Sequence, residues 1–297
     1  MTIYSPGAEP GFTGSPLDRA DHLRGDPAAI ARLRSDPAAR LIRLEALDPV
    51  LDGKGRLVWD GIDQAAADAE LALLGLIDGA PMFAALVEAP NGARRSPAIM
   101  GLMAAMAPAE ASTYAAARSL VDWHARHRFC AVCGHETTPA RAGWARNCGH
   151  CGAEHYPRTD PVVIMLAEQG GRALVGRGHH FPPRFYSALA GFVEVGESME
   201  EAVARELFEE GGVRATRVRY LSSQPWPFAS SLMMACTADV ADDALLLDAN
   251  ELADAMWVTR AEVQAALAGD PAARFLAPPP YAIAHTLLRW WAERTSE

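Results

Sequence analysis

One stretch in the second half of the chain shows apolar residues at helical spacing between a start signal and a stop signal. Ser198 is followed three residues later by Glu201, which is the pattern of a capping box. The helix should therefore begin near Met199. Gly211 and Gly212 should end it, because glycine enters the left-handed backbone conformation without a steric penalty.

Two carboxylates interrupt the apolar stripe of this predicted helix. The stripe consists of Met199, Ala202, Val203 and Leu207. Glu206 and Glu210 fall inside it, and Glu209 lies on its edge. An ionised carboxylate is costly to bury alone, so the pattern predicts a cation beside the pair, and oxygen ligands favour Mg²⁺ or Mn²⁺. The alternative is a glutamate-rich surface helix with salt bridges to Arg205 or Arg214.

The remaining hydrophobic pattern predicts a mixture of strands and helices. Apolar or alternating runs indicate strands at residues 41–44, 56–59, 82–87, 162–167, 173–176, 187–190, 217–222, 232–238 and 256–258. Helical spacing indicates helices at residues 99–106, 110–128, 260–267 and 282–292. Residues 71–77 fit either a short helix or a strand. The Asp-Pro pairs at residues 26–27 and 36–37 are each expected to start a helix.

Composition indicates a globular chain of about two domains. Half of its 297 residues are apolar, and no apolar run approaches the roughly 20 residues that a membrane span needs. The first 15 residues are expected to be disordered and lack the features of a signal peptide, so we expect a cytoplasmic protein. The net charge of −10 disfavours generic electrostatic capture of duplex nucleic acid.

Four of the five cysteines form two Cys-x-x-Cys pairs separated by fourteen residues. This spacing is typical of a zinc ribbon, and the predicted ligands are Cys130, Cys133, Cys148 and Cys151. Four thiolates complete a tetrahedron, so we expect one structural Zn²⁺ per chain rather than a catalytic one. The alternative, a mixed site with His135, His150 or His155, is disfavoured because the cysteine set is complete. Cys236 lies in an apolar run and should be a buried free thiol.

The stretch around the predicted helix carries a family resemblance. Gly191, Glu197 and the uninterrupted run of residues 205–213 resemble the Nudix box at every fixed position. The resemblance implies an α/β/α sandwich around a mixed sheet, and hydrolysis of a nucleoside diphosphate linked to another group. It also implies that the two glutamates of the apolar stripe hold metals and that Arg205 orients a glutamate by ion pairing.

A second stretch narrows the resemblance. Two prolines flank Trp226 and keep the segment around it extended and stiff. This segment resembles the marker that the NADH pyrophosphatase branch of the Nudix family carries shortly after its box. One position departs from the marker, because Ala229 stands where the branch usually has a third proline. With the ribbon, the box and the late Glu251, the resemblance covers residues 130–257.

The branch resemblance implies an NAD(H) diphosphatase that cleaves NADH or NAD⁺ to nicotinamide mononucleotide and AMP. The metal ligands would be the Ala190 carbonyl, Glu206, Glu210 and Glu251, with Glu209 as a further ligand. Glu209 or, as the runner-up, Glu197 would accept the proton of the attacking water. The substrate-binding residues would be Tyr156, Phe192, Gln224, Pro225, Trp226, Pro227, Phe228, Ala229, Ser230 and Ser231. The branch also implies a homodimer.

These observations predict a mixed α/β protein in three parts. Residues 1–125 would form a mixed N-terminal domain without a chemical motif, residues 126–157 the zinc ribbon, and residues 158–297 the Nudix domain. The same pocket could accept the NAD cap of an RNA 5′ end, since the cleaved bond is identical. Two alternatives stay open: a Nudix diphosphatase for ADP-ribose or another nucleotide conjugate, and a non-catalytic zinc-ribbon module that binds nucleic acid or a protein partner.

Overall fold

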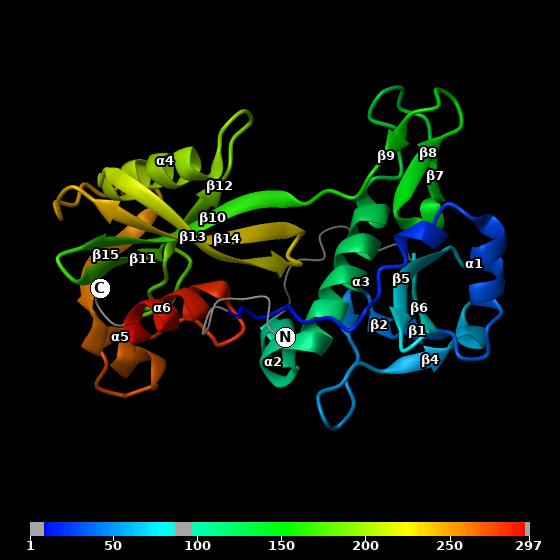
Figure 1. The fold of residues 1–297 in the computed structure, drawn as a ribbon, viewed down its shortest axis with the longest axis horizontal. Helices are drawn as coiled ribbons and strands as arrows, with labels where there is room; N and C mark the ends of the chain where they lie inside the picture. Colours follow the sequence, from blue (N-terminus) through cyan, green and yellow to red (C-terminus); the bar gives the residue numbers. More distant parts are fainter. Residues whose placement is uncertain (1–8, 87–96, 295–297) are drawn as a thin grey trace. The chain divides into compact units, whose positions relative to one another are not determined.

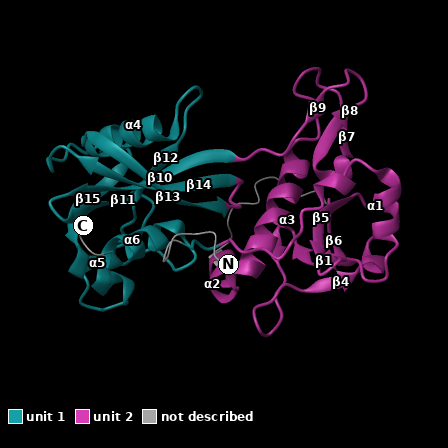
Figure 2. Ribbon diagram, in the orientation of Figure 1, with its two compact units in different colours: residues 1–11, 160–225, 231–297 teal, residues 12–159, 226–230 magenta. Residues whose placement is uncertain are grey.

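The computed structural model describes residues 9–86 and 97–294 of the chain. By its internal contacts the chain forms two compact units (Figure 2). Unit 1 comprises residues 1–11, 160–225 and 231–297, and unit 2 comprises residues 12–159 and 226–230. The ribbon thus shares a unit with the N-terminal region, and the division into three domains stays a prediction.

Unit 1 is built on a mixed sheet (Figure 1). Within the described ranges its six strands follow the order β13-β14-β10-β11-β15, and β12 pairs with β10. The bounds are β10 Asp160–Gln169, β11 Arg172–Gly178, β12 Leu189–Phe192, β13 Ala215–Trp226, β14 Ser231–Val240 and β15 Leu252–Thr259. The pair β10 and β14 is parallel, whereas β11 and β12 run antiparallel to β10. The mixed sheet that the family resemblance implied is confirmed.

Helices cover both faces of this sheet (Figure 1). The helices are α4 (Met199–Gly211), α5 (Arg260–Leu267) and α6 (Ile283–Glu293). Because side chains alternate along a strand, Val163 and Met165 of β10 pack against α4, whereas Ile164 and Leu166 pack against α5 and α6. The α/β/α sandwich is therefore confirmed, and α4 lies alone on its face of the core among these helices.

Unit 2 combines a small sheet, helices and the ribbon (Figure 1). The four-stranded sheet has the order β4-β1-β6-β5. Its strands are β1 Arg40–Ile42, β4 Trp59–Gly61, β5 Leu71–Ile77 and β6 Ala80–Ala85, while β2 Leu44–Glu45 and β3 Asp48–Pro49 form a separate pair. The helices are α1 Pro27–Arg34, α2 Pro97–Ala105 and α3 Pro108–Arg126, with 3-10 turns η1 Asp21–Leu23, η2 Ile62–Gln64 and η3 Arg141–Gly143. The ribbon strands are β7 Thr137–Ala140, β8 Ala145–Cys148 and β9 Glu154–His155.

The sequence predictions are confirmed for most elements, with differences at the ends. The ambiguous stretch, residues 71–77, is the strand β5, because it pairs with β6 along its whole length. The first Asp-Pro pair starts α1 as predicted. No helix in the described ranges combines the length and the apolar character that crossing a membrane requires.

Three expectations are wrong. The second Asp-Pro pair does not start a helix, because the Asp36 carboxylate accepts the Ala38 N–H at 2.8 Å and closes a turn before β1. The strand expected at residues 56–59 begins only at Trp59. Order also starts earlier than expected, since Phe12 is fully buried. Residues 1–8 of the expected disordered segment, and residue 87 of the expected strand 82–87, lie outside the described residues.

Candidate active site

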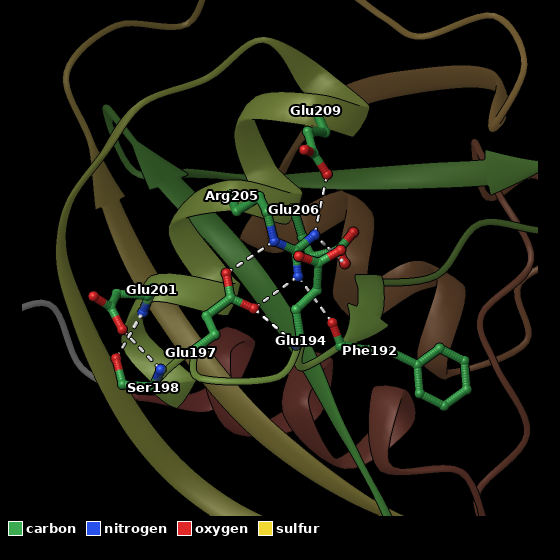
Figure 3. A network of polar contacts seen from close by, with 8 residues as sticks. All are labelled: Phe192, Glu194, Glu197, Ser198, Glu201, Arg205, Glu206 and Glu209. Carbon is green, nitrogen blue, oxygen red and sulfur yellow. Dashed lines mark hydrogen bonds and ion pairs between the residues drawn. The ribbon is translucent and has the colours of Figure 1, made fainter.

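Helix α4 has the two ends that its sequence predicted. It begins at Met199 with a complete capping box, in which the Ser198 hydroxyl accepts the Glu201 N–H at 3.2 Å (Figure 3). In return the Glu201 carboxylate accepts the Ser198 N–H at 2.8 Å. The helix ends at Gly211, and Gly212 adopts a left-handed φ of 73°. Because both ends are fixed, the face that α4 turns toward the sheet is fixed as well.

The two glutamates of the apolar stripe are buried, as the helical spacing predicted. Glu206 and Glu210 are each only 8% exposed. Glu251, an exposed residue immediately before β15, brings a third carboxylate to the same place, and one oxygen of each lies within 4.8 Å of the others. The fold therefore gathers carboxylates from two distant segments of the chain.

The negative charge of this carboxylate cluster is suited to binding a cation. The Glu210 Oε2 is buried and has no hydrogen-bond partner among the described residues. Burial, with a further effect of the charges on Glu206 and Glu251, raises the pKa of Glu210 to about 8. Burial also raises the pKa of Glu206, although a hydrogen bond from Arg205 opposes the shift. A buried oxygen without a partner and three mutually repelling carboxylates fit a divalent cation such as Mg²⁺ or Mn²⁺.

Gly191 makes room for this cluster. A Cβ at that position would lie 1.9 Å from the carboxyl carbon of Glu206 and 2.0 to 2.2 Å from its oxygens. Real Cβ atoms do not approach other atoms so closely, so any larger residue would displace the Glu206 carboxylate. The box therefore needs glycine here because β12 passes directly against the glutamate.

Arg205 is the centre of a hydrogen-bond network (Figure 3). Its guanidinium donates five hydrogen bonds of 2.8 to 3.1 Å, to both carboxylate oxygens of Glu197, Glu206 Oε1, Glu209 Oε2 and the Phe192 carbonyl. These bonds use all five N–H groups of a guanidinium. They raise the pKa of Arg205, mainly through Glu197. The ion pair that the family resemblance implied is thus present, and a lysine could not make the same set of bonds.

The two candidate bases differ in their surroundings. Glu197 has both oxygens bound to Arg205 and also accepts the Glu194 N–H at 3.0 Å, and these bonds lower its pKa. The Glu209 side chain is 54% exposed, and among the described residues its one hydrogen bond is to Arg205 at 3.1 Å. A base must have an oxygen free to accept a proton, so the geometry favours Glu209 over Glu197.

The remaining predicted residues of unit 1 lie on β12, at the end of β13 and at the start of β14. Ala190 is exposed, and Phe192 is 61% exposed with its ring pointing away from the Arg205 network (Figure 3). Gln224 is fully buried, and its amide binds the carbonyls of Gly11 and Tyr281 and the Ile283 N–H at 2.8 to 3.0 Å. Gln224 thus links separate segments of unit 1 through hydrogen bonds. Its expected contact with substrate stays a prediction.

The middle of the marker segment, residues 226–230, belongs to unit 2. Trp226 contacts Phe12 edge-on at 5.7 Å, and the Pro227 carbonyl accepts a hydrogen bond from Arg118 of α3 at 3.0 Å. Of the other marker residues, Pro225 and Ala229 are exposed, and Phe228, Ser230 and Ser231 are half-buried. Arg118 is not apparent as a candidate from the sequence, because nothing in the local sequence of α3 distinguishes it from other helical arginines.

Tyr156 lies in unit 2, directly after the ribbon strand β9. Its side chain is 56% exposed, and its hydroxyl donates to Glu154 at 2.9 Å. The predicted substrate-binding set is therefore divided between the two units, with Phe192 in unit 1 and Tyr156 in unit 2.

The ribbon gathers its four cysteines into one cluster. The sulfurs all lie within 4.8 Å of one another, with 3.6 Å between Cys130 and Cys151 and 3.5 Å between Cys133 and Cys148. Gly134 and Gly152 adopt left-handed φ values of 78° and 74°, as each turn folds back, and their N–H groups bind the carbonyls of the first cysteines of each pair at 2.9 Å. A compact set of four sulfurs fits a tetrahedral structural Zn²⁺.

Histidines surround this cluster without completing it. His155 Nε2 lies 3.2 Å from the Cys130 sulfur, as expected for a group that hydrogen-bonds to a ligand. The rings of His135 and His150 stack on each other at 3.7 Å. One ligand atom each of Cys133, His135 and His150 also lies within 4.8 Å of the others, but this set offers three ligands, whereas the four cysteines supply a complete tetrahedral set.

Comparisons with known proteins cover nearly the whole chain. Family models match in three places: the NUDIX domain at residues 157–277, the NADH pyrophosphatase zinc ribbon domain at 125–156, and the NADH pyrophosphatase-like rudimentary NUDIX domain at 27–123. The last match covers the region in which the sequence analysis found no motif.

Individual relatives agree with these matches. The chain is 39% identical over 290 residues to the NAD-capped RNA hydrolase NudC of Mycobacterium bovis, covering 93% of this chain and 92% of that protein. It is 43% identical over 192 residues to the NAD-capped RNA hydrolase NUDT12 of Macaca fascicularis, of whose length it spans 42%. A NUDIX hydrolase structure from Nitrosomonas europaea matches 56% of this chain and 90% of its own, at 20% identity and a TM-score of 0.45. The chain belongs to the Nudix hydrolase family, in the branch that carries the NADH pyrophosphatase zinc ribbon and rudimentary Nudix domain.

Proposed function

We propose that this protein is an NAD(H) diphosphatase that hydrolyses NADH or NAD⁺ to nicotinamide mononucleotide and AMP, and that also removes NAD caps from RNA 5′ ends. The observation that carries the proposal is the cluster of Glu206, Glu210 and Glu251, with its buried unpartnered oxygen, on the helix of a complete Nudix box. The choice of substrate is supported by relatives named NAD-capped RNA hydrolases.

The carboxylate cluster would hold Mg²⁺ or Mn²⁺ together with the Ala190 carbonyl. When bound, the cation neutralises the charge that develops on the pyrophosphate oxygens. The cluster supplies carboxylate oxygens, which hard cations prefer, and the Glu210 Oε2 is buried without a hydrogen-bond partner among the described residues. Glu209 lies on the same helix and could hold a further cation.

The proton transfer is assigned to Glu209, an exposed glutamate of α4 beside the carboxylate cluster. Glu209 would take a proton from the attacking water, whose oxygen forms a bond to one phosphorus while the bridging P–O bond breaks and its electrons pass to the leaving phosphate. Arg205 would hold Glu197 ionised and fix the loop that precedes α4 through the Phe192 carbonyl. Glu197 therefore serves as a positioning group in this proposal.

The dinucleotide would be bound by exposed aromatic residues and the marker segment. Phe192 and Tyr156 each present more than half of their side-chain surface, and a planar base can stack on such a ring. Residues 224–231 would complete the substrate-binding surface. We further propose a homodimer, as in the branch that the chain resembles, and a cytoplasmic location, in keeping with five free cysteines.

A turnover panel tests this function. Purified protein with Mg²⁺ or Mn²⁺ is offered NADH, NAD⁺, NAD-capped RNA and ADP-ribose, and the released AMP and nicotinamide mononucleotide are measured. We expect turnover of the NAD compounds. Faster turnover of ADP-ribose would favour the alternative diphosphatase, and tight, salt-dependent RNA binding without any hydrolysis would favour the non-catalytic module.

The Glu210→Gln variant should keep its fold and lose about 10³-fold in kcat, because the cation loses a charged ligand. The matched control is Glu200→Gln, since Glu200 is an exposed residue of the same helix outside the cluster. Circular dichroism and zinc content report whether each variant is folded. Equal activity of the two variants would contradict the proposed metal site.

A further inference from the structure

Arg118 is a buried arginine of the rudimentary Nudix domain that contacts the marker segment. It lies on α3 and is only 2% exposed. Apart from residues 226–230, unit 2 consists of the continuous stretch of residues 12–159. A buried guanidinium requires hydrogen-bond partners and a counter-charge. The partners of Arg118 therefore indicate which segments of the chain it positions.

These partners tie the marker segment to the N-terminal chain. Nε donates to the Pro227 carbonyl at 3.0 Å, and Nη1 donates to the Leu47 carbonyl at 2.9 Å. The guanidinium also lies over the ring of Phe228, with 4.9 Å between its central carbon and the ring centroid. Asp48 supplies a carboxylate at 3.8 Å. Arg118 thus contacts two consecutive residues of the marker, one through the backbone and one through the ring.

Aromatic contacts extend this arrangement. The rings of Trp226 and Phe228 meet edge-on at 5.3 Å, and Trp226 meets Phe12 edge-on at 5.7 Å. The planar guanidinium has fixed donor directions, so it can set the position of the Pro227 carbonyl and the Phe228 ring at the same time. This restraint acts just before Ala229, where the chain lacks the proline that usually stiffens the marker.

We propose that Arg118 is a positioning residue for substrate recognition, which holds residues 226–230 in the conformation that binds the dinucleotide. The inference rests on the proposed function. It assigns a role in substrate binding to the rudimentary Nudix domain, whose own sequence carries no catalytic motif. Since Arg118 lies outside the carboxylate cluster, its loss should weaken substrate binding more than it slows the chemical step.

Steady-state kinetics with NADH test this role. In Arg118→Met we expect KM to rise about tenfold while kcat stays within about twofold of the wild type, which is the pattern of lost ground-state binding. Arg118→Lys keeps the charge but cannot reach both carbonyls with the same geometry, so KM should rise by a smaller factor of about three. Hydrogen exchange of the peptide covering residues 226–230 should be faster in both variants than in the wild type.

The matched control is Arg146→Met. Arg146 is another buried arginine of unit 2, and among the described residues it forms hydrogen bonds with Thr137 and His124 rather than with the marker. The Arg146→Met variant should have a lower free energy of unfolding than the wild type, and its KM for NADH should not change.

An unchanged KM in folded Arg118→Met, or an equal rise in Arg146→Met, would overturn the inference. If Arg118→Met does not fold, an unchanged KM for NADH in the Arg118→Lys variant would overturn the inference instead. Wild-type protein that fails to hydrolyse NADH would instead defeat the proposed function itself, so the two failures are distinguishable.

Discussion

The two candidate metal sites of this protein are built in opposite ways. The ribbon collects four thiolates of one kind from two short turns, and its ligand set is closed. The carboxylate cluster places two glutamates on one helix and a third on a distant segment, and one buried oxygen has no hydrogen-bond partner within the described ranges. The difference lies in charge compensation: the closed set leaves no position for a further ligand, whereas the carboxylate set carries negative charge that a cation would compensate.

The largest effect, on zinc binding and stability, is expected from removing one of the four cysteine ligands of the ribbon. Cys148→Ser removes a buried ligand, and we expect loss of zinc and of about 5 kcal/mol or more of stability, since the binding energy of a structural metal is folding energy. Zinc content and thermal unfolding measure it. Cys236→Ala is the control, because this buried cysteine lies outside the ribbon. Full zinc occupancy in Cys148→Ser would show that three sulfurs suffice.

A smaller effect, on kcat, is expected from placing a side chain against the carboxylate cluster. Gly191→Ala would push the Glu206 carboxylate away from its place, and we expect a loss of about 10²-fold in kcat, the usual consequence of moving a catalytic group by an ångström. Zinc content should not change. Gly178→Ala is the control, because no atom lies within 4 Å of its added Cβ. Wild-type turnover in Gly191→Ala would mean that Glu206 can move without harm.

The smallest effect concerns stability without Mg²⁺ or Mn²⁺. Because the folded pKa of Glu210 is raised to about 8, the folded protein binds more protons than the unfolded chain, and its stability falls as pH rises from about 4.5 to about 8. Glu210→Gln removes this charge and should stabilise the protein at pH 8.5 by about 1–3 kcal/mol.

Thermal unfolding at pH 5 and pH 8.5, with zinc retained, measures this difference. Mn²⁺ should raise the melting temperature of the wild type more than that of the variant. The control is Glu209→Gln, which changes an exposed carboxylate of the same helix and should leave the metal-free stability unaltered. A Glu210→Gln variant that is less stable than the wild type at pH 8.5 would show that the buried charge of Glu210 does not destabilise the protein.

Local sequence patterns predicted those features whose cause is itself local. The capping box, the left-handed Gly212 and the inward direction of Glu206 follow from residues within a few positions of one another. The two cysteine pairs are equally local, because each turn is complete within a few residues. Local patterns failed at Asp36, where a side chain to backbone bond closes a turn that competes with a helix start.

The amino-acid sequence was sufficient to predict the box helix, the zinc ligands and the family, because periodicity, caps and ligand spacing act over short distances along the chain. Three further features became apparent only in the folded chain: Glu251 joins the buried glutamates, Gly191 lies against Glu206, and Gln224 is used inside unit 1. The folded chain also shows that Arg118 contacts the marker segment. These contacts join residues far apart in sequence, and they form because packing and the need to pair buried polar groups bring distant segments together.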